Sequence, residues 1–488
     1  MADRPQRGGG TLIHLLGSLT EGILNLLFSI ILVRLISQSD FGTWRQFLSL
    51  AAIGWNIAIF GLPSSLYFFY STAKPNEAGT IARRTLWMAL ILGALGSVLF
   101  FFGLDFAAGK FDNPQLWDEA LLFSSYFLLG FPLFIITPML VAADQRAVLA
   151  MLRISMNSLK LAALAALVWL NSDLRTMLIA LNVVALIQFA AHLYFYLRAA
   201  GPALLPWRHR LDEQLKFSGH MMLQGAAGQL SLETDKLLVS ASRTPAEFAS
   251  YSVGARELPL VLLIPYSITD SIVPNLSRFA QEKAFPGFYQ LLHRWIKRVA
   301  LLMYPVFALV LFQHREIVTI LYTADYIDGA LPLLVIGCLI PIRVASNYQL
   351  LISLGGSRDV MLASFANLAL VAGLGYTFLQ MFGPWGAALG LAVAEYSVNC
   401  AVLLRVAKRT ETPLSGVYPW LYLFKLLLIA VGSGAAALPV LHVLGNLSLF
   451  WQLVCYGLTM MTLFCAAVLM LRMVDSDDLA LLRAKLRR

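Results

Sequence analysis

Two arginines of this sequence fall inside long apolar segments, where a charged side chain needs a polar partner. They are Arg256 and Arg343, and the second follows Pro341 closely. Arg34 and Arg45 flank a short polar stretch between two further apolar segments. A guanidinium group binds phosphate or carboxylate oxygens through paired hydrogen bonds, so these four arginines predict contacts to an anionic substrate. For Arg34 and Arg45 the alternative is a side chain that reaches water at the surface.

Three glutamates lie at comparable positions and predict binding of a proton or another cation. Glu21 and Glu395 are near the middle of their apolar segments, and Glu257 is adjacent to Arg256. An ionisable group at such a position is costly unless it faces a polar interior, so each is a candidate for ion coupling. The alternative is structural: Arg256 pairs with Glu257 or Glu21 and holds helices together.

Signatures of an enzyme are scarce. The sequence contains no Walker A loop, no HExxH motif and no GxSxG motif. Asp475 and Asp477 resemble the carboxylate pair of metal-dependent glycosyltransferases, but a leucine-rich stretch follows, which favours the first turn of a short amphipathic helix. The four cysteines stand singly in apolar runs, as core residues do. We therefore expect no catalytic residues, no metal and no other cofactor.

The segments that carry these charges determine the class of protein. Of 488 residues, 59% are hydrophobic and 13% are charged, and the mean hydropathy is +0.73. Soluble proteins carry about 25% charged residues, so this surface cannot mostly face water. About twenty apolar residues cross a bilayer core. The sequence predicts an all-α polytopic membrane protein with about fourteen transmembrane helices: 11–33, 42–62, 85–104, 119–142, 148–170, 175–197, 217–240, 247–273, 296–313, 330–353, 360–381, 385–405, 418–442 and 450–472.

The basic residues give the orientation of these segments. When the loops are assigned alternately to two sides, 25 of the 36 Lys and Arg residues fall on the side of the N-terminus and seven on the other. Cytoplasmic loops carry the excess of Lys and Arg, so both termini are predicted in the cytoplasm. The net charge of +9 is then explained by basic loops next to anionic lipid, and no nucleic-acid partner is expected.

A weak internal repeat predicts the domain organisation. Residues 40–44 (DFGTW) resemble residues 247–251 (EFASY), 207 positions further on, and we expect Pro63 and Pro274 to end corresponding spans. Six spans per copy predict two six-helix lobes as a parallel pseudo-repeat, with the substrate pathway between them and two C-terminal helices in addition. The predicted parts are a cytoplasmic N-terminus (1–10), an N-terminal lobe (11–197), a cytoplasmic loop (198–216), a C-terminal lobe (217–405), spans thirteen and fourteen (418–472) and a cytoplasmic tail (473–488).

Three stretches carry a resemblance to a known family. They run from Arg34 through Asp40-Phe41-Gly42 to Gly61-Leu62-Pro63, from Thr234-Asp235-Lys236 to Tyr251-Ser252-Val253-Gly254-Ala255-Arg256, and from Gly355-Gly356-Ser357-Arg358 through Asn367 to Gly383-Pro384-Trp385-Gly386. In order and spacing they resemble the polysaccharide transport family of the multidrug/oligosaccharidyl-lipid/polysaccharide exporter superfamily, the Wzx-type flippases. The resemblance implies two lobes, alternating access and an undecaprenyl-pyrophosphate-linked oligosaccharide as cargo. It also implies that Arg256 contacts the pyrophosphate or acidic sugars, and that Arg34 and Arg45 lie near the outer gate.

The predicted function is therefore a flippase of the bacterial inner membrane that serves O-antigen, capsule or exopolysaccharide synthesis. Its expected partners are the lipid-linked oligosaccharide, membrane lipids and, as further candidates, polysaccharide polymerase or assembly proteins. A cation-coupled multidrug exporter and a peptidoglycan-precursor flippase of the same superfamily are alternatives. A membrane-embedded glycosyl-transferring enzyme is a third alternative, which the absence of a long catalytic loop disfavours.

Overall fold

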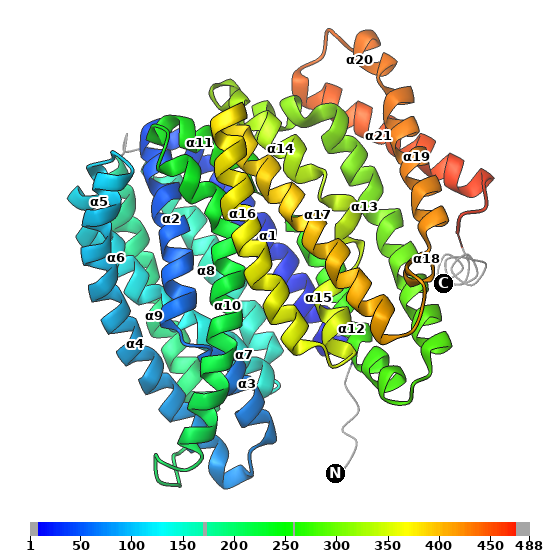
Figure 1. The fold of residues 1–488 in the computed structure, drawn as a ribbon. Coiled ribbons are helices and arrows are strands. Elements are labelled where there is room, and N and C mark those ends of the chain that lie inside the picture. Colours follow the sequence, from blue (N-terminus) through cyan, green and yellow to red (C-terminus); the bar gives the residue numbers. More distant parts are fainter. Residues whose placement is uncertain (1–7, 169–172, 257–258, 475–488) are drawn as a thin grey trace. The chain divides into compact units, whose positions relative to one another are not determined.

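The structure is a computed structural model that describes residues 8–168, 173–256 and 259–474. All regular elements in these ranges are helices (Figure 1). Packing divides the chain into two compact units, which we call unit 1 (residues 1–252 with 368–380) and unit 2 (residues 253–367 with 381–488).

The helices of unit 1 are α1 (Gly8–Leu35), α2 (Gln38–Ala58), α3 (Leu62–Thr72), α4 (Pro75–Lys110), α5 (Gln115–Asp118), α6 (Ala120–Gly130), α7 (Leu133–Ala142), α8 (Arg146–Val168), α9 (Leu174–Ala200), α10 (Leu211–Ser240) and most of α11 (Pro245–Gly254). Unit 2 contains α12 (Pro259–Gln281), α13 (Phe285–Tyr322), η1 (Ala324–Gly329), α14 (Ala330–Gly337), η2 (Ile340–Val344), α15 (Asn347–Ser353), α17 (Pro384–Arg409), α18 (Leu414–Val417), α19 (Trp420–Ala437), α20 (Pro439–Val443) and α21 (Leu449–Met470). Helix α16 (Ser357–Phe382) contributes to both units.

The outer faces of these helices suit a hydrocarbon solvent. Leu99, Phe102 and Phe106 of α4 are 73%, 66% and 76% exposed. Such faces are compatible with lipid, and a helix satisfies its own backbone hydrogen bonds there. Nine helices of the described residues are long and apolar enough to cross a membrane, or up to eleven spans when two bent pairs are included. The chain is therefore an all-α, multi-pass membrane protein, as the composition predicts.

The predicted number of fourteen spans is not confirmed. Segments 11–33, 217–240 and 247–273 correspond to α1, α10 and α11–α12 but are not among the eleven. Segment 42–62 is also wrong in shape, because α2 and α3 form a pair bent by 43° that continues to Thr72. Pro63 does not end a span: it lies in the first turn of α3, where an N–H is not needed. Pro274 lies inside α12, which continues to Gln281.

Segment 330–353 is not one continuous helix either. It consists of η1–α14 followed by η2–α15, and the two parts are bent by 46°. Pro341 lies at the start of η2 and has no N–H to donate, so a regular α-helix cannot pass through it without losing a hydrogen bond. The break places Arg343 on the 3₁₀ turn η2 and Asn347 at the first residue of α15.

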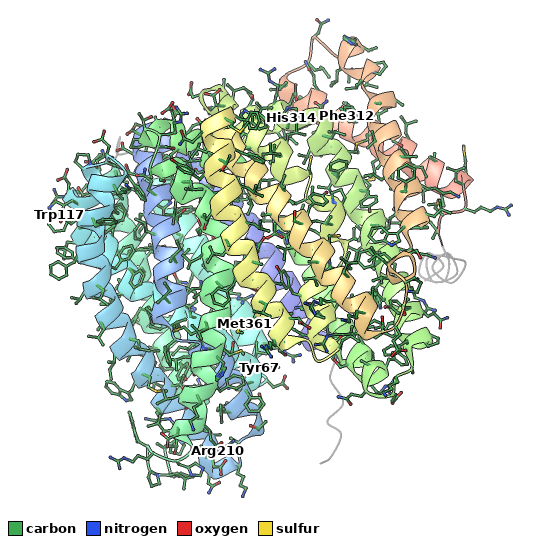
Figure 2. All side chains as sticks on the ribbon, viewed as in Figure 1. Tyr67, Trp117, Arg210, Phe312, His314 and Met361 are labelled. Atoms are coloured by element: carbon green, nitrogen blue, oxygen red, sulfur yellow. The ribbon has the colours of Figure 1, made fainter. Side chains whose placement is uncertain are left out.

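Within unit 1, long helices run side by side, with α4 against α6 and α6 against α9 (Figure 1). Helix α1 packs along α8, and α10 packs on α2 and α3. Figure 2 shows Trp117 of α5 and Arg210, which precedes α10, at opposite ends of this unit. These two positions, which the predicted topology assigns to opposite sides of the membrane, thus lie at opposite ends of the unit.

A buried arginine holds the connection between α9 and α10 on the end of α4. Arg84 is 1% exposed and donates to the carbonyl oxygens of Trp207 (2.7 Å) and His209 (2.6 Å). Its Nε also donates to Gln214 Oε1 at 3.1 Å. Arg84 immediately precedes the predicted span 85–104 and is one of the 25 basic residues counted on the side of the N-terminus, whereas the structure buries it against neutral acceptors. Burial disfavours the charged form of a side chain, so these hydrogen bonds are necessary.

Helix α13 is the central element of unit 2 and contacts α12, α14, α19 and α21. Gly434 of α19 allows a close approach, because a Cβ there would lie 2.6 Å from the ring of Phe312. Tyr456 of α21 donates to the Gly434 carbonyl oxygen at 2.9 Å. The two C-terminal helices are therefore fixed on α13 by a small residue and a buried hydrogen bond. Figure 2 places Phe312 at the end of unit 2 opposite to Met361 of α16.

Candidate functional site

A buried carboxylate, Glu395, is the centre of a polar network in unit 2. Helix α17 carries Glu395 and Asn399 one turn apart, and they are 5% and 9% exposed. Asn367 of α16 donates to Glu395 Oε1 at 3.0 Å, and Asn399 Nδ2 lies 3.3 Å from Glu395 Oε2. Arg343 Nη1, on η2, lies 3.6 Å from the same Oε2 atom. Two predicted candidates from distant segments therefore form one ion pair.

The network continues from Asn399 toward the start of α19. Asn347 Nδ2 donates to Asn399 Oδ1 at 2.8 Å, and Tyr418 donates to Asn347 Oδ1. These three side chains are buried. Because each amide both donates and accepts, the chain from Tyr418 to Glu395 is satisfied by groups from three separate segments. This network gives Glu395 a fixed orientation.

A cavity that is partly open to solvent adjoins this network, with about 380 Å³ of empty space when the open part is counted. Its polar lining comes from Arg343, Ser346, Asn347, Tyr348 and Asn399, and its apolar lining from Val261, Pro265, Ile342 and Ala345. A guanidinium beside amide and hydroxyl groups, with apolar walls, is suited to bind an anionic group in low-dielectric surroundings. Arg343 is therefore the predicted substrate-binding residue whose surroundings fit that role best.

Arg256 lies in a different environment from Arg343. It follows α11 in unit 2, is exposed, and lines a cavity, partly open to solvent, whose other walls are apolar: Val261, Val310, Leu333, Ile336, Gly337, Leu339 and Ile340. Glu257, its predicted partner and an ion-coupling candidate, lies outside the described residues. The other residues around this cavity are therefore apolar. The contact of Arg256 with a pyrophosphate stays a prediction.

The remaining candidates have structural contacts in unit 1. Arg34 donates to the Ile30 carbonyl oxygen (2.7 Å) in the last turn of α1. Arg45 Nε donates to Ser252 Oγ at 3.3 Å and thereby joins α2 to α11. Glu21 pairs with Arg153 of α8 at 3.4 Å. These contacts do not test a role in transport, which stays a prediction.

A second buried ionisable group in unit 1 was not among the predicted site residues. Asp235 is fully buried and accepts a hydrogen bond from Tyr251 at 2.6 Å. Lys236 Nζ lies 3.4 Å from Asp235 and 3.7 Å from Glu233. The sequence shows these charges near one end of α10, but the signal that Asp235 is buried is its contact with Tyr251 of α11, 16 positions further on. The group joins α10 to α11.

The fold defines the class of protein to which this chain is similar. It is similar to a solved structure of the lipid II flippase MurJ in an inward closed conformation, with 14% identity, a TM-score of 0.72, and coverage of 94% of this chain and 99% of that chain. An inward-facing multidrug resistance transporter of the MATE family, part of the MOP superfamily, has a TM-score of 0.64 at 13% identity, with coverage of 82% and 98%. A point mutant of the Vibrio cholerae MATE transporter VcmN has a TM-score of 0.59 at 16% identity, with coverage of 83% and 96%. The fold is that of these membrane transporters.

The family follows from the sequence match. The model of the family described as "Polysaccharide biosynthesis protein" matches residues 8–280, more than half of the chain. The chain belongs to this family, and the resemblance predicted from the sequence is confirmed. No curated protein sequence matches the chain.

Proposed function

We propose that this protein is a flippase that moves a lipid-linked oligosaccharide across the bacterial inner membrane. Membership of a polysaccharide biosynthesis family supports the oligosaccharide, and the transporter fold supports movement across a bilayer. The observation that carries the proposal is the cavity lined by Arg343 beside the buried Glu395 network. An intramembrane arginine next to a polar cavity is a recognised mark of a pathway for an anion.

The substrate proposed is an undecaprenyl-pyrophosphate-linked oligosaccharide for O-antigen, capsule or exopolysaccharide. Arg343 binds its diphosphate, and Arg256 is a second contact. Both termini lie in the cytoplasm, as the distribution of basic residues indicates. Alternating access of two lobes carries the headgroup, while Glu395, Glu257 or Glu21 couples movement to an ion. Polymerase or assembly proteins are proposed to receive the product.

The fold also supports one competing substrate. The MurJ structure that this chain resembles over 94% of its length is described as a lipid II flippase, so a peptidoglycan precursor is the second candidate. A multidrug exporter shares the same fold. Cationic drugs favour acidic residues without a basic partner, whereas the described Glu395 is paired with Arg343. This pairing favours an anionic cargo over a cationic drug.

Reconstitution into liposomes tests the proposal. Fluorescent lipid-linked oligosaccharide, lipid II and a cationic drug are supplied separately to vesicles that contain the wild-type protein or Arg343→Gln. We expect transport of the oligosaccharide lipid alone, and at least a tenfold lower rate for Arg343→Gln, because about 1.4 kcal/mol of lost binding gives that factor. Arg409→Gln is the matched control, since Arg409 pairs with Asp359 in the same unit at 2.7 Å.

Two outcomes would contradict the proposal. Transport of lipid II or of the drug in preference to the oligosaccharide lipid would reassign the substrate. An unchanged rate for Arg343→Gln would remove Arg343 from the pathway and leave the fold without its proposed anion site.

A further inference from the structure

Arg343 and Glu395 occupy one site, although their residue types suggest two functions. The closest atoms, Nη1 and Oε2, are 3.6 Å apart, and the side chains are 18% and 6% exposed. The pair connects η2, in the broken span, to the intact helix α17. Arg343 is the residue proposed to bind the substrate, and Glu395 is a residue proposed to bind the coupling ion. Because the two are paired, binding of the substrate at Arg343 affects binding of the ion at Glu395.

The charge balance around Glu395 depends on this arginine. Its other described partners are the neutral amides of Asn367 and Asn399. Helix α17 packs against α14, α15 and α18; the titratable groups in or next to these elements are Cys338, Tyr348 and Tyr418, and Tyr396 lies on α17 itself. Tyr396 donates to the Cys338 carbonyl oxygen, and Tyr418 reaches the network through Asn347. In the part of the chain that the structure describes, Arg343 is the only cation that pairs with Glu395.

An anion in the adjoining cavity competes with Glu395 for Arg343. Arg343 lines this partly open cavity together with Ser346, Asn347 and Asn399, which offer further hydrogen bonds. When the guanidinium turns to a bound anion, Glu395 loses its cation but stays buried. A buried carboxylate without a cation is strongly disfavoured, and it gains stability by taking up a proton.

We propose that Arg343 and Glu395 form an exchange site at which a diphosphate and a proton bind together: the anion takes Arg343 and the proton neutralises Glu395. The identity of the anion rests on the proposed function, whereas the exchange itself rests on the geometry of the pair. The proton comes from the solution that the cavity faces and is released when the anion leaves and Arg343 returns. The bound complex therefore carries one negative charge less than it would if the anion bound alone.

Binding measurements at several pH values test this exchange. The probe is UDP-glucose, a diphosphate diester whose phosphates stay ionised near neutral pH, and the full chain is held in lipid nanodiscs. If binding of UDP-glucose promotes binding of a proton, a proton must equally promote binding of UDP-glucose. We therefore expect the affinity of the wild-type protein for UDP-glucose to rise as the pH falls, by at most about tenfold per pH unit for one proton. Calorimetry in buffers of different ionisation enthalpy counts the protons taken up directly.

Three variants separate the roles of the two partners. Glu395→Gln retains one acceptor oxygen, which can still accept from Asn367, but cannot take up the proton, so we expect binding that no longer depends on pH. Arg343→Gln removes the anion contact, so we expect a loss of affinity of tenfold or more. Asp359→Asn, in the exposed pair with Arg409, is the control and should retain the wild-type pH dependence.

The same pH dependence in Glu395→Gln as in the wild type, or binding that Arg343→Gln leaves intact, would overturn the exchange. A parallel liposome assay keeps this separate from the proposed function. If the wild type transports the oligosaccharide lipid but Glu395→Gln shows unchanged proton uptake, the exchange fails and the function stands. If the wild type binds the probe with proton uptake but transports no oligosaccharide lipid, the function fails and the exchange stands.

Discussion

At the scale of single residues, the surroundings of a charge decide its role. Arg84 and Arg343 are both buried or nearly so, but their partners differ. Arg84 donates to backbone carbonyls and Gln214, which keeps the connection between α9 and α10 in place. Arg343 faces a carboxylate and a cavity, where an anion can compete for it. The first arrangement gives stability and the second gives a binding site.

Replacing Arg84 should therefore destabilise the protein. Arg84→Met leaves the Trp207 and His209 carbonyl oxygens and Gln214 Oε1 without their donor, at about 1–3 kcal/mol for each group that stays buried. We expect a lower midpoint of thermal unfolding in detergent and faster proteolysis of the connection between α9 and α10. Arg208→Met, at an exposed position in that connection, is the control. Equal midpoints for the two variants would show that the buried hydrogen bonds contribute little.

At the scale of elements, the contact of α2 with α11 joins the two copies of the sequence motif. Arg45 and Ser252 are 207 positions apart, the spacing at which residues 40–44 resemble residues 247–251, and they are hydrogen-bonded. Gln38 also donates to Ser250 Oγ at 2.7 Å. Gly42 permits this approach, because a Cβ there would lie 1.9 Å from the Pro245 carbonyl oxygen. The two similar sequence segments, residues 40–44 and 247–251, thus lie where α2 and α11 pack against each other.

A methyl group at Gly42 should separate the two helices. In a protein whose four cysteines are replaced, we expect Gln38→Cys and Ser250→Cys to be joined efficiently by a short thiol crosslinker. Gly42→Ala should reduce that yield severalfold, since backbone atoms of α11 must move to accommodate the Cβ. Gly103→Ala is the control, because nothing lies within 4 Å of its Cβ position. An undiminished yield in Gly42→Ala would refute the role of the close approach.

At the scale of the whole molecule, the charge distribution predicts which ends of the helices face the cytoplasm. Single cysteines at exposed positions should therefore react differently with a membrane-impermeant maleimide in intact cells. We expect labelling of Trp117→Cys in unit 1 and Arg315→Cys in unit 2. Arg208→Cys and Arg358→Cys should react only after the membrane is opened. Labelling of both cysteine positions of unit 1, or of both positions of unit 2, in intact cells would contradict the predicted orientation. As a control, quantitative labelling in lysed cells shows that all four positions are accessible.

The sequence by itself determined that this is a polytopic membrane protein, that it is helical, and which family it belongs to. Hydropathy and the distribution of basic residues are local properties that can be read without knowledge of how the helices pack. It also supplied Arg343 and Glu395 as candidates, since a charge in an apolar segment is visible in one dimension. Only the tertiary structure decided that these two residues are one pair, that Arg84 is buried, and that the segment around Pro341 is broken. The first two depend on contacts between residues far apart in the chain, such as the 52 positions between Asn347 and Asn399. The break begins at Pro341, which cannot donate a backbone hydrogen bond. Periodicity carries no record of such contacts, because they are set by how helices pack.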